Sequence, residues 1–183
     1  VLVSDINIDA AEETARDIRT EGGEASTATV DVTSEQSIAG LFDVLRERYG
    51  RIDVLHNNVG MTRPGSTVDV SVEDWDFIFA LNLRSMFLTC RAALPMMTDQ
   101  RSGAIVNISS ISSMRWLGSP MASYDASKAG VTSPGFTAKC ALVTTVPDTR
   151  TAPPLHSFAA RLRVLKKRAN NSHLSIRSLP APG

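Results

Sequence analysis

Short apolar runs and longer amphipathic stretches alternate over the first 131 residues of this 183-residue chain. Each apolar run is dominated by Val, Ile, Leu or Ala and is followed by polar or turn-forming residues. Runs of this length bounded by such residues predict buried strands. We expect four strands, at residues 1–4, 25–30, 52–56 and 104–108.

Between the predicted strands, apolar residues recur three or four positions apart, which is the spacing of one helix face. The first two helices end at glycines, Gly22-Gly23 and Gly50, and the third ends near Gly103. The expected starts are Asp9, Thr33 and Ser71 as N-caps, with Glu12, Gln36 and Asp74 three positions on, and a last helix begins near Ser123.

Strands that alternate with helices of this length predict right-handed crossovers, a parallel sheet and helices on both of its faces. The fold class is therefore α/β, a doubly wound sheet of Rossmann-like type. Ligands of such sheets bind beyond the carboxyl ends of the strands. Polar residues occupy those ends here, which makes them a candidate site: Asp5, Asp31, Asn57, Asn58, Ser109 and Ser110.

The pattern stops after Val131. Residues 132–183, which we call the tail, contain six of the nine prolines and eight Lys or Arg against one acid, Asp148, in a chain of zero net charge. Pro134 ends the last helix about two turns in, and we expect no strand that extends the sheet and little fixed structure. Residues 162–168 could form a short basic helix that binds a polyanion, or simply a solvated charged patch.

Composition also limits the partners and the compartment. Zero net charge gives no reason to expect nucleic acid, and no apolar run approaches the ~20 residues that span a bilayer. Cys90 and Cys140 stand fifty residues apart without a CxxC motif, which argues against a zinc site and a disulfide framework. We expect no bound metal and a reducing, cytoplasmic location.

The residues best suited to chemistry are Tyr124 and Lys128, which share one helix face at a spacing of four. A phenol has a pKa near 10, and proton transfer at neutral pH requires this to fall by roughly three units. A neighbouring ammonium favours the phenolate and so supplies such a shift. The alternative is an exposed helix pair with no catalytic role.

Two further polar positions are candidates. Ser110 follows the fourth strand, where its hydroxyl could bind a substrate oxygen, or where Ser109 and Ser110 could simply cap a turn. Asn82 lies inside the third helix, where its side chain competes for backbone hydrogen bonds, so it either has a specific partner or faces solvent.

Together these residues resemble the short-chain dehydrogenase/reductase family in order and spacing. The resemblance covers residues 1 to about 131 and rests on a joint set of motifs: Asn57-Asn58-Val59-Gly60, Asn82, Ser109-Ser110 and Tyr124-x-x-x-Lys128. Val59 stands where the family usually has Ala. The resemblance implies hydride transfer between an alcohol or ketone and a nicotinamide cofactor.

The resemblance also implies a role for each matching residue. Tyr124 would be the general acid/base and Lys128 would bind the nicotinamide ribose and lower the phenol pKa. Ser110 would orient the substrate carbonyl, and Asn82 would anchor a proton-relay water.

For the cofactor, the resemblance implies that Asn58 and Gly60 line the pocket and that Asp31, before Val32, meets the adenine ring. Asp5 matches the carboxylate that binds the adenosine ribose and repels a 2′-phosphate, which favours NAD over NADP. Asp5 could instead help to start the next helix, a role that Asp9 would already fill.

Two parts of the family pattern are not found. The glycine-rich turn that presents backbone N–H groups to the pyrophosphate, and the strand before it, would lie before Val1. The last strands of the family sheet are not recognisable after Val131. We therefore expect a truncated domain at residues 1–131 whose own activity is impaired, and we expect no stable tetramer or dimer of the family kind.

Two other interpretations stay open. The chain could be a non-catalytic nucleotide-binding or interaction protein on the same scaffold, although such a protein has no need for the proton-transfer residues. It could also be a product of a frameshift or retained intron after Val131, which would explain the abrupt change in charge and proline content.

Overall fold

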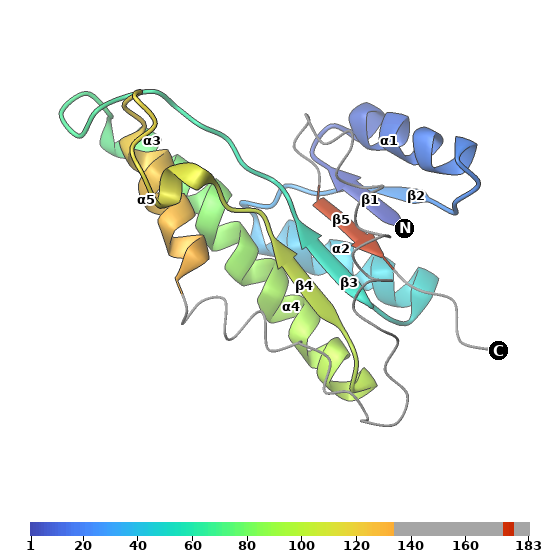
Figure 1. Cartoon of the computed structure of the whole chain (residues 1–183). Coiled ribbons are helices and arrows are strands. Elements are labelled where there is room, and N and C mark those ends of the chain that lie inside the picture. Colours follow the sequence, from blue (N-terminus) through green and yellow to red (C-terminus); the bar gives the residue numbers. More distant parts are fainter. Residues whose placement is uncertain (134–173, 178–183) are drawn as a thin grey trace.

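The computed structural model of the chain describes residues 1–133 and, for the backbone only, 174–177. Five strands form one sheet in the order β2-β1-β5-β3-β4 (Figure 1). The strands are β1 (Leu2–Asp5), β2 (Ser26–Thr29), β3 (Val54–Asn57), β4 (Ala104–Asn107) and β5 (Leu174–Arg177). The predicted basic helix at residues 162–168 lies outside the described residues.

Strands β1 to β4 all run in one direction, as the sequence predicts. β1 is parallel to β2 and β3 is parallel to β4, while β5 lies antiparallel to both β1 and β3. The expectation that the tail adds no strand is wrong, because β5 lies at the centre of the sheet. The sheet is consequently mixed rather than wholly parallel.

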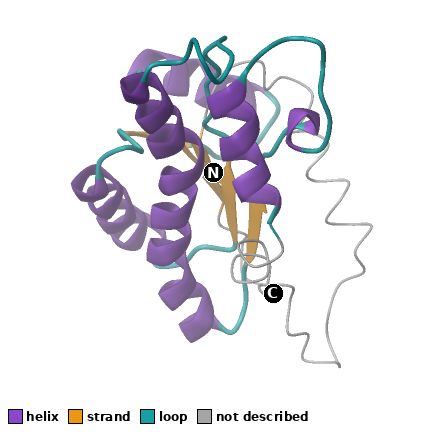
Figure 2. Cartoon of the chain, turned by 90° about the vertical axis from the view of Figure 1, so that its left-hand side faces the viewer, coloured by secondary structure: helices purple, strands orange, loops and turns teal. Residues whose placement is uncertain are grey.

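Helices cover both faces of the sheet. Val3 of β1 packs with Ala11 and Ala15 of α1 (Ile8–Thr20). The neighbouring residue Leu2 points to the opposite face and packs with side chains of α2 (Glu35–Tyr49) and α4 (Ser85–Gln100). The turned view in Figure 2 shows helices packed along the edge-on sheet.

Local signals explain most of the helix ends. Gly50 ends α2 in a left-handed conformation, with φ of 65°, and Ser71 caps α3 (Val72–Phe79) by accepting the Asp74 amide. Two predicted N-caps are displaced: Asn7 caps α1 instead of Asp9, and Ser34 caps α2 instead of Thr33. Each true cap holds extended backbone just before the helix, as an N-cap requires.

A π-helical turn, η1 (Ala80–Arg84), joins α3 to α4 into one helical segment, Val72–Gln100. By length and composition alone, this is the one segment of the described residues that could cross a membrane. Its α4 part carries seven buried residues and packs against α2 and β3. Buried core helices of globular proteins meet the same criterion.

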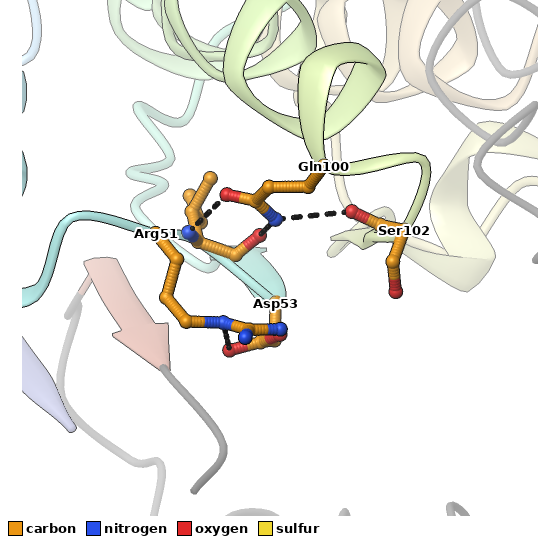
Figure 3. Close-up of polar contacts among 5 residues, drawn as sticks. Arg51, Asp53, Gln100 and Ser102 are labelled. Atoms are coloured by element: carbon orange, nitrogen blue, oxygen red, sulfur yellow. Dashed lines mark hydrogen bonds and ion pairs between the residues drawn. The ribbon is translucent and has the colours of Figure 1, made fainter. Parts of the chain in front are cut away.

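A polar clamp fixes the amino end of β3 (Figure 3). The amide of Gln100, the last residue of α4, accepts from the Ile52 backbone N–H and donates to the Ile52 carbonyl, both at 2.8 Å. Beside it, Arg51 pairs with the buried carboxylate of Asp53. The Gln100 contacts hold the end of α4 to the segment that leads into β3, at the edge of the sheet opposite to the candidate site.

Candidate active site

The carboxyl ends of β1 to β4 meet at one edge of the sheet, and amide side chains join two of them. Asn57 Nδ2, at the end of β3, donates to Asn107 Oδ1, at the end of β4, at 2.8 Å. Thr89 of α4 donates to Asn57 Oδ1, also at 2.8 Å. Asn57 is buried, so its part at this edge is to fix the two strand ends.

Tyr124 and Lys128 lie on α5 (Ala122–Thr132), which begins beside the predicted Ser123 and ends before Pro134 as expected. The Lys128 Nζ atom lies 5.8 Å from the centre of the Tyr124 ring and donates to the Ile108 carbonyl at 2.8 Å. Lys128 is only 2% exposed, so the alternative of an exposed pair is wrong. Burial lowers the pKa of its ammonium to about 8.

The two serines after β4 have different local roles. Ser109 Oγ donates to the Lys128 carbonyl at 2.8 Å and so ties this segment to α5. Ser110 caps the short helix η2 (Ile111–Ser113), where its Oγ accepts from the amide and hydroxyl of Ser112. The capping role of Ser110 is thus observed, and its contact with a substrate stays a prediction.

Asn82 has the specific partners that a mid-helix Asn requires. It is fully buried in η1, and its side chain accepts from the Met61 N–H and donates to the Met61 carbonyl, both at 2.9 Å. Its Nδ2 also donates to Ser127 Oγ at 3.1 Å. A solvent-facing Asn82 is excluded, and a π-helical turn at this place is a common mark of functional sites.

Gly60 brings the loop after β3 against the same group. A Cβ atom at Gly60 would lie 3.0 Å from Lys128 Nζ and 3.5 Å from Asn82 Oδ1. The absence of a side chain therefore allows this loop to approach both residues closely. Four of the predicted residues therefore meet at one place: Gly60, Asn82, Tyr124 and Lys128. Asn58, which is half-buried, lies two residues before Gly60 in the same loop.

The predicted adenosine end lies beyond β1 and β2. Asp5 Oδ1 accepts from the Asn7 N–H at 2.8 Å, so Asp5 does support the start of α1, contrary to our argument that Asp9 fills that role. Asp31 Oδ1 accepts from the amide and hydroxyl of Thr33. Val32 is 5% exposed and packs in the core, which leaves only its backbone to meet a cofactor.

Three residues that hold this region together were not predicted from the sequence. The Ser127 hydroxyl accepts from Asn82 and donates to the Tyr124 carbonyl. The backbone N–H and carbonyl of Met61 both bind the Asn82 side chain. Arg84 donates to the Thr33 carbonyl. Ser127 lies between Tyr124 and Lys128 in the chain and could have been suspected. Neither Met61 nor Arg84 carries a sequence signal, because both contacts join segments distant in sequence.

The described residues fit the two ends of a dinucleotide better than its pyrophosphate. The Asp9 and Ala10 amides of α1 donate to Asn7 Oδ1, and the Ser37 amide of α2 donates to Ser34 Oγ. β5 runs antiparallel to β1 and β3 and therefore begins at this edge, and among the described residues no helix begins there between β1 and β3. A pyrophosphate site usually consists of free helix N-terminal amides.

This combination of a Rossmann-like sheet and a half-buried tyrosine beside a buried lysine is typical of dinucleotide-dependent oxidoreductases. The chain belongs to the short-chain dehydrogenase family, whose model matches residues 1–144. The match extends thirteen residues past the boundary at 131 that we expected from the sequence.

Characterised relatives span several activities. Cyclopentanol dehydrogenase of Comamonas sp. is 38% identical over 143 residues, covering 78% of this chain and 56% of that protein. A 3-oxoacyl-[acyl-carrier-protein] reductase of Synechocystis sp. is 38% identical over 129 residues, covering 70% and 51%. The chain therefore spans about half the length of these relatives.

Solved structures of short-chain oxidoreductases share the fold of this chain. A gluconate 5-dehydrogenase from Burkholderia cenocepacia, in complex with NADP and tartrate, superposes with a TM-score of 0.68 at 30% identity, covering 75% of this chain and 54% of the other. A metagenomic short-chain oxidoreductase in complex with NADP gives 0.67 at 31% identity, covering 72% and 59%. The predicted fold class is confirmed.

Proposed function

We propose that the protein transfers hydride between a small-molecule alcohol or ketone and NAD(H), with Tyr124 as the proton donor and acceptor. The observation that carries the proposal is the buried Lys128 ammonium beside the Tyr124 ring. Its charge lies 5.8 Å from the centre of the ring whose hydroxyl would transfer the proton. The bound nicotinamide supplies or accepts the hydride.

The neighbouring residues have supporting roles in this proposal. Lys128 binds the nicotinamide ribose, and Gly60 and Asn58 line the pocket next to it. Ser110 orients the substrate oxygen toward Tyr124, and its position three residues after the end of β4 supports this. Because the oxygen and the nitrogen of the Asn82 side chain already have protein partners, a relay water at Asn82 would bind its backbone.

NAD is proposed as the preferred cofactor because of Asp5. Its carboxylate is fixed at the end of β1 by the Asn7 N–H, where it would bind the ribose hydroxyls and repel a 2′-phosphate. Two structural neighbours are complexes with NADP, so the proposed preference rests on Asp5 of this chain and not on the comparisons. Asp31 and the backbone of Val32 would meet the adenine ring.

The chain of residues 1–183 is proposed to be impaired, with residues 1–131 as a partial cofactor-binding domain. The capped starts of α1 and α2 and the direction of β5 support this, because they leave the pyrophosphate without its usual donors. We expect no measurable turnover of NAD+ with alcohols or of NADH with ketones. Clear turnover would contradict this part of the proposal.

The catalytic proposal is tested in a chimera in which residues 1–131 replace the matching segment of the Comamonas cyclopentanol dehydrogenase. Tyr124→Phe should lower turnover more than about 100-fold and leave NADH binding nearly unchanged, because only the transferable proton is lost. The control is Tyr49→Phe, since Tyr49 is the other tyrosine and contacts Ser26 Oγ at 2.6 Å, away from the site.

Two outcomes would overturn the assignment of Tyr124. One is a Tyr124→Phe chimera that keeps more than about 1% of the parent turnover. The other is a Tyr49→Phe chimera that loses as much activity as Tyr124→Phe, because the loss would then reflect misfolding rather than proton transfer.

A further inference from the structure

A group of large apolar side chains lies exposed on the segment between the two proposed catalytic residues Ser110 and Tyr124. Ile111 is 50% exposed, Met114 76%, Trp116 66% and Leu117 44%. Four exposed side chains of this size within seven residues are unusual, because the described surface elsewhere shows such residues singly or in pairs. We call these four residues, together with Met61, the apolar cluster.

The segment is held at both ends by contacts next to the catalytic residues. At its start, Ser113 donates to the Ser110 carbonyl at 2.6 Å, and η2 packs against α5. At its end, Met121 pairs with Gly65 in a short parallel bridge, and the Ala122 N–H donates to the Gly65 carbonyl at 3.0 Å. The exposed side chains are thus carried by a segment whose ends are fixed.

Met61 joins the same region from the other side. The loop after β3 reaches the end of the segment, because Thr62 Oγ1 contacts Met121 Sδ at 3.4 Å. The Met61 backbone is held by Asn82, yet its side chain is 47% exposed. The backbone is therefore fixed at the catalytic group while an apolar side chain faces outward beside it.

We propose that the apolar cluster binds the hydrocarbon part of the substrate, so that the protein acts on alcohols or ketones that bear an apolar ring or chain. This rests on the proposed function, because it places the reacting oxygen at Ser110 and Tyr124. Flexible Met and flat Trp side chains adapt to an apolar body and gain from its burial. A polyhydroxy substrate would leave its hydroxyls unpaired against them.

The chain contains two tryptophans, so Trp116 can report binding directly. Trp75 stacks on Phe79 within α3, and Trp75→Phe keeps a ring there and leaves Trp116 as the only tryptophan. In this variant of the 183-residue chain, cyclopentanol, cyclohexanol and cyclooctanol should each shift the Trp116 emission to shorter wavelength with saturation. Each added ring methylene should lower the midpoint about fourfold.

Xylitol and 3-hydroxybutyrate serve as polyhydroxy and anionic probes, and neither should shift the emission. Leu117→Ser should weaken cycloalkanol binding about tenfold. The matched control is Ile8→Ser, since Ile8 is 42% exposed on α1 and should leave the midpoints unchanged. The readout needs no cofactor and no turnover, so it can fail or succeed independently of the proposed hydride transfer.

Several results would overturn the proposal. One is a shift of the Trp116 emission with xylitol or 3-hydroxybutyrate at a lower concentration than with the cycloalkanols. A second is an emission shift with the cycloalkanols that does not saturate. A third is an equal loss of cycloalkanol affinity in Leu117→Ser and Ile8→Ser. A fourth is a blue-shifted emission without ligand that depends on protein concentration, because a second copy of the chain would then cover the apolar cluster.

Discussion

Asn82 offers the sharpest test of how the site is held together. Its fully buried side chain makes three hydrogen bonds: two to the backbone N–H and carbonyl of Met61, and one to the hydroxyl of Ser127. Asn82→Ala removes all three and leaves the Met61 N–H and carbonyl without these partners. The loop after β3 then loses its attachment to η1.

The expected loss follows from those contacts. At about 1 kcal/mol for each hydrogen bond, and somewhat more where a buried group stays unpaired, Asn82→Ala should lower the free energy of unfolding by about 3 to 4 kcal/mol. Asn7→Ala is the matched control, because Asn7 is an exposed N-cap that accepts from two amides. Its loss should cost about 1 kcal/mol.

Urea unfolding of the 183-residue chain, followed by circular dichroism, measures both values. For a chain of this length the Asn82→Ala midpoint on heating should fall by about 10 °C, against about 3 °C for Asn7→Ala. If Asn82→Ala costs no more than Asn7→Ala, the side chain does not hold the loop, and the account of the site given above is wrong.

Three other predictions concern stability and cofactor choice. The Lys128 pKa is about 8 in the folded chain and about 10.5 when unfolded, so stability should rise from pH 8 to 10.5, where only the unfolded form keeps the proton. Urea titrations should show this rise lost in Lys128→Met. Gly40→Ala in α2 should raise the free energy of unfolding by about 0.5 to 1 kcal/mol, since the added Cβ meets nothing within 4 Å. Gly103→Ala should lower the free energy of unfolding, because its Cβ would fall 2.5 Å from Met97 Cγ. In the chimera, Asp5→Ala should let NADP compete with NAD in steady-state assays; an unchanged ratio would remove Asp5 as the determinant.

Strong local patterns made most of the fold predictable. The four parallel strands and the four helical segments lie where apolar periodicity placed them, within a few residues. Gly50 and Ser71 end or begin helices as expected, because their signals depend only on adjacent backbone. The displaced caps at Asn7 and Ser34 show the limit: several Ser, Thr, Asn and Asp residues stand near each helix start, and only the turn geometry selects one.

The unpredicted features depend on contacts between distant segments. Four residues of β5 carry no strong strand signal, and their place between β1 and β3 follows from unpaired backbone groups on both neighbours rather than from their own pattern. Likewise, the sequence could indicate that Asn82 needs a partner but not that Met61 would be that partner. The motif residues were found because the family resemblance fixes their order, and their catalytic roles stay predictions.

The position of β5 also has a consequence for biosynthesis. In the described sheet, the β1–β2 pair and the β3–β4 pair are joined only through β5, which is the last of the five strands in the chain. During translation the inner edges of β1 and β3 therefore stay unpaired until residues 174–177 have left the ribosome. Exposed strand edges are prone to pair with other chains. We expect a nascent chain that stalls before residue 174 to depend strongly on chaperones.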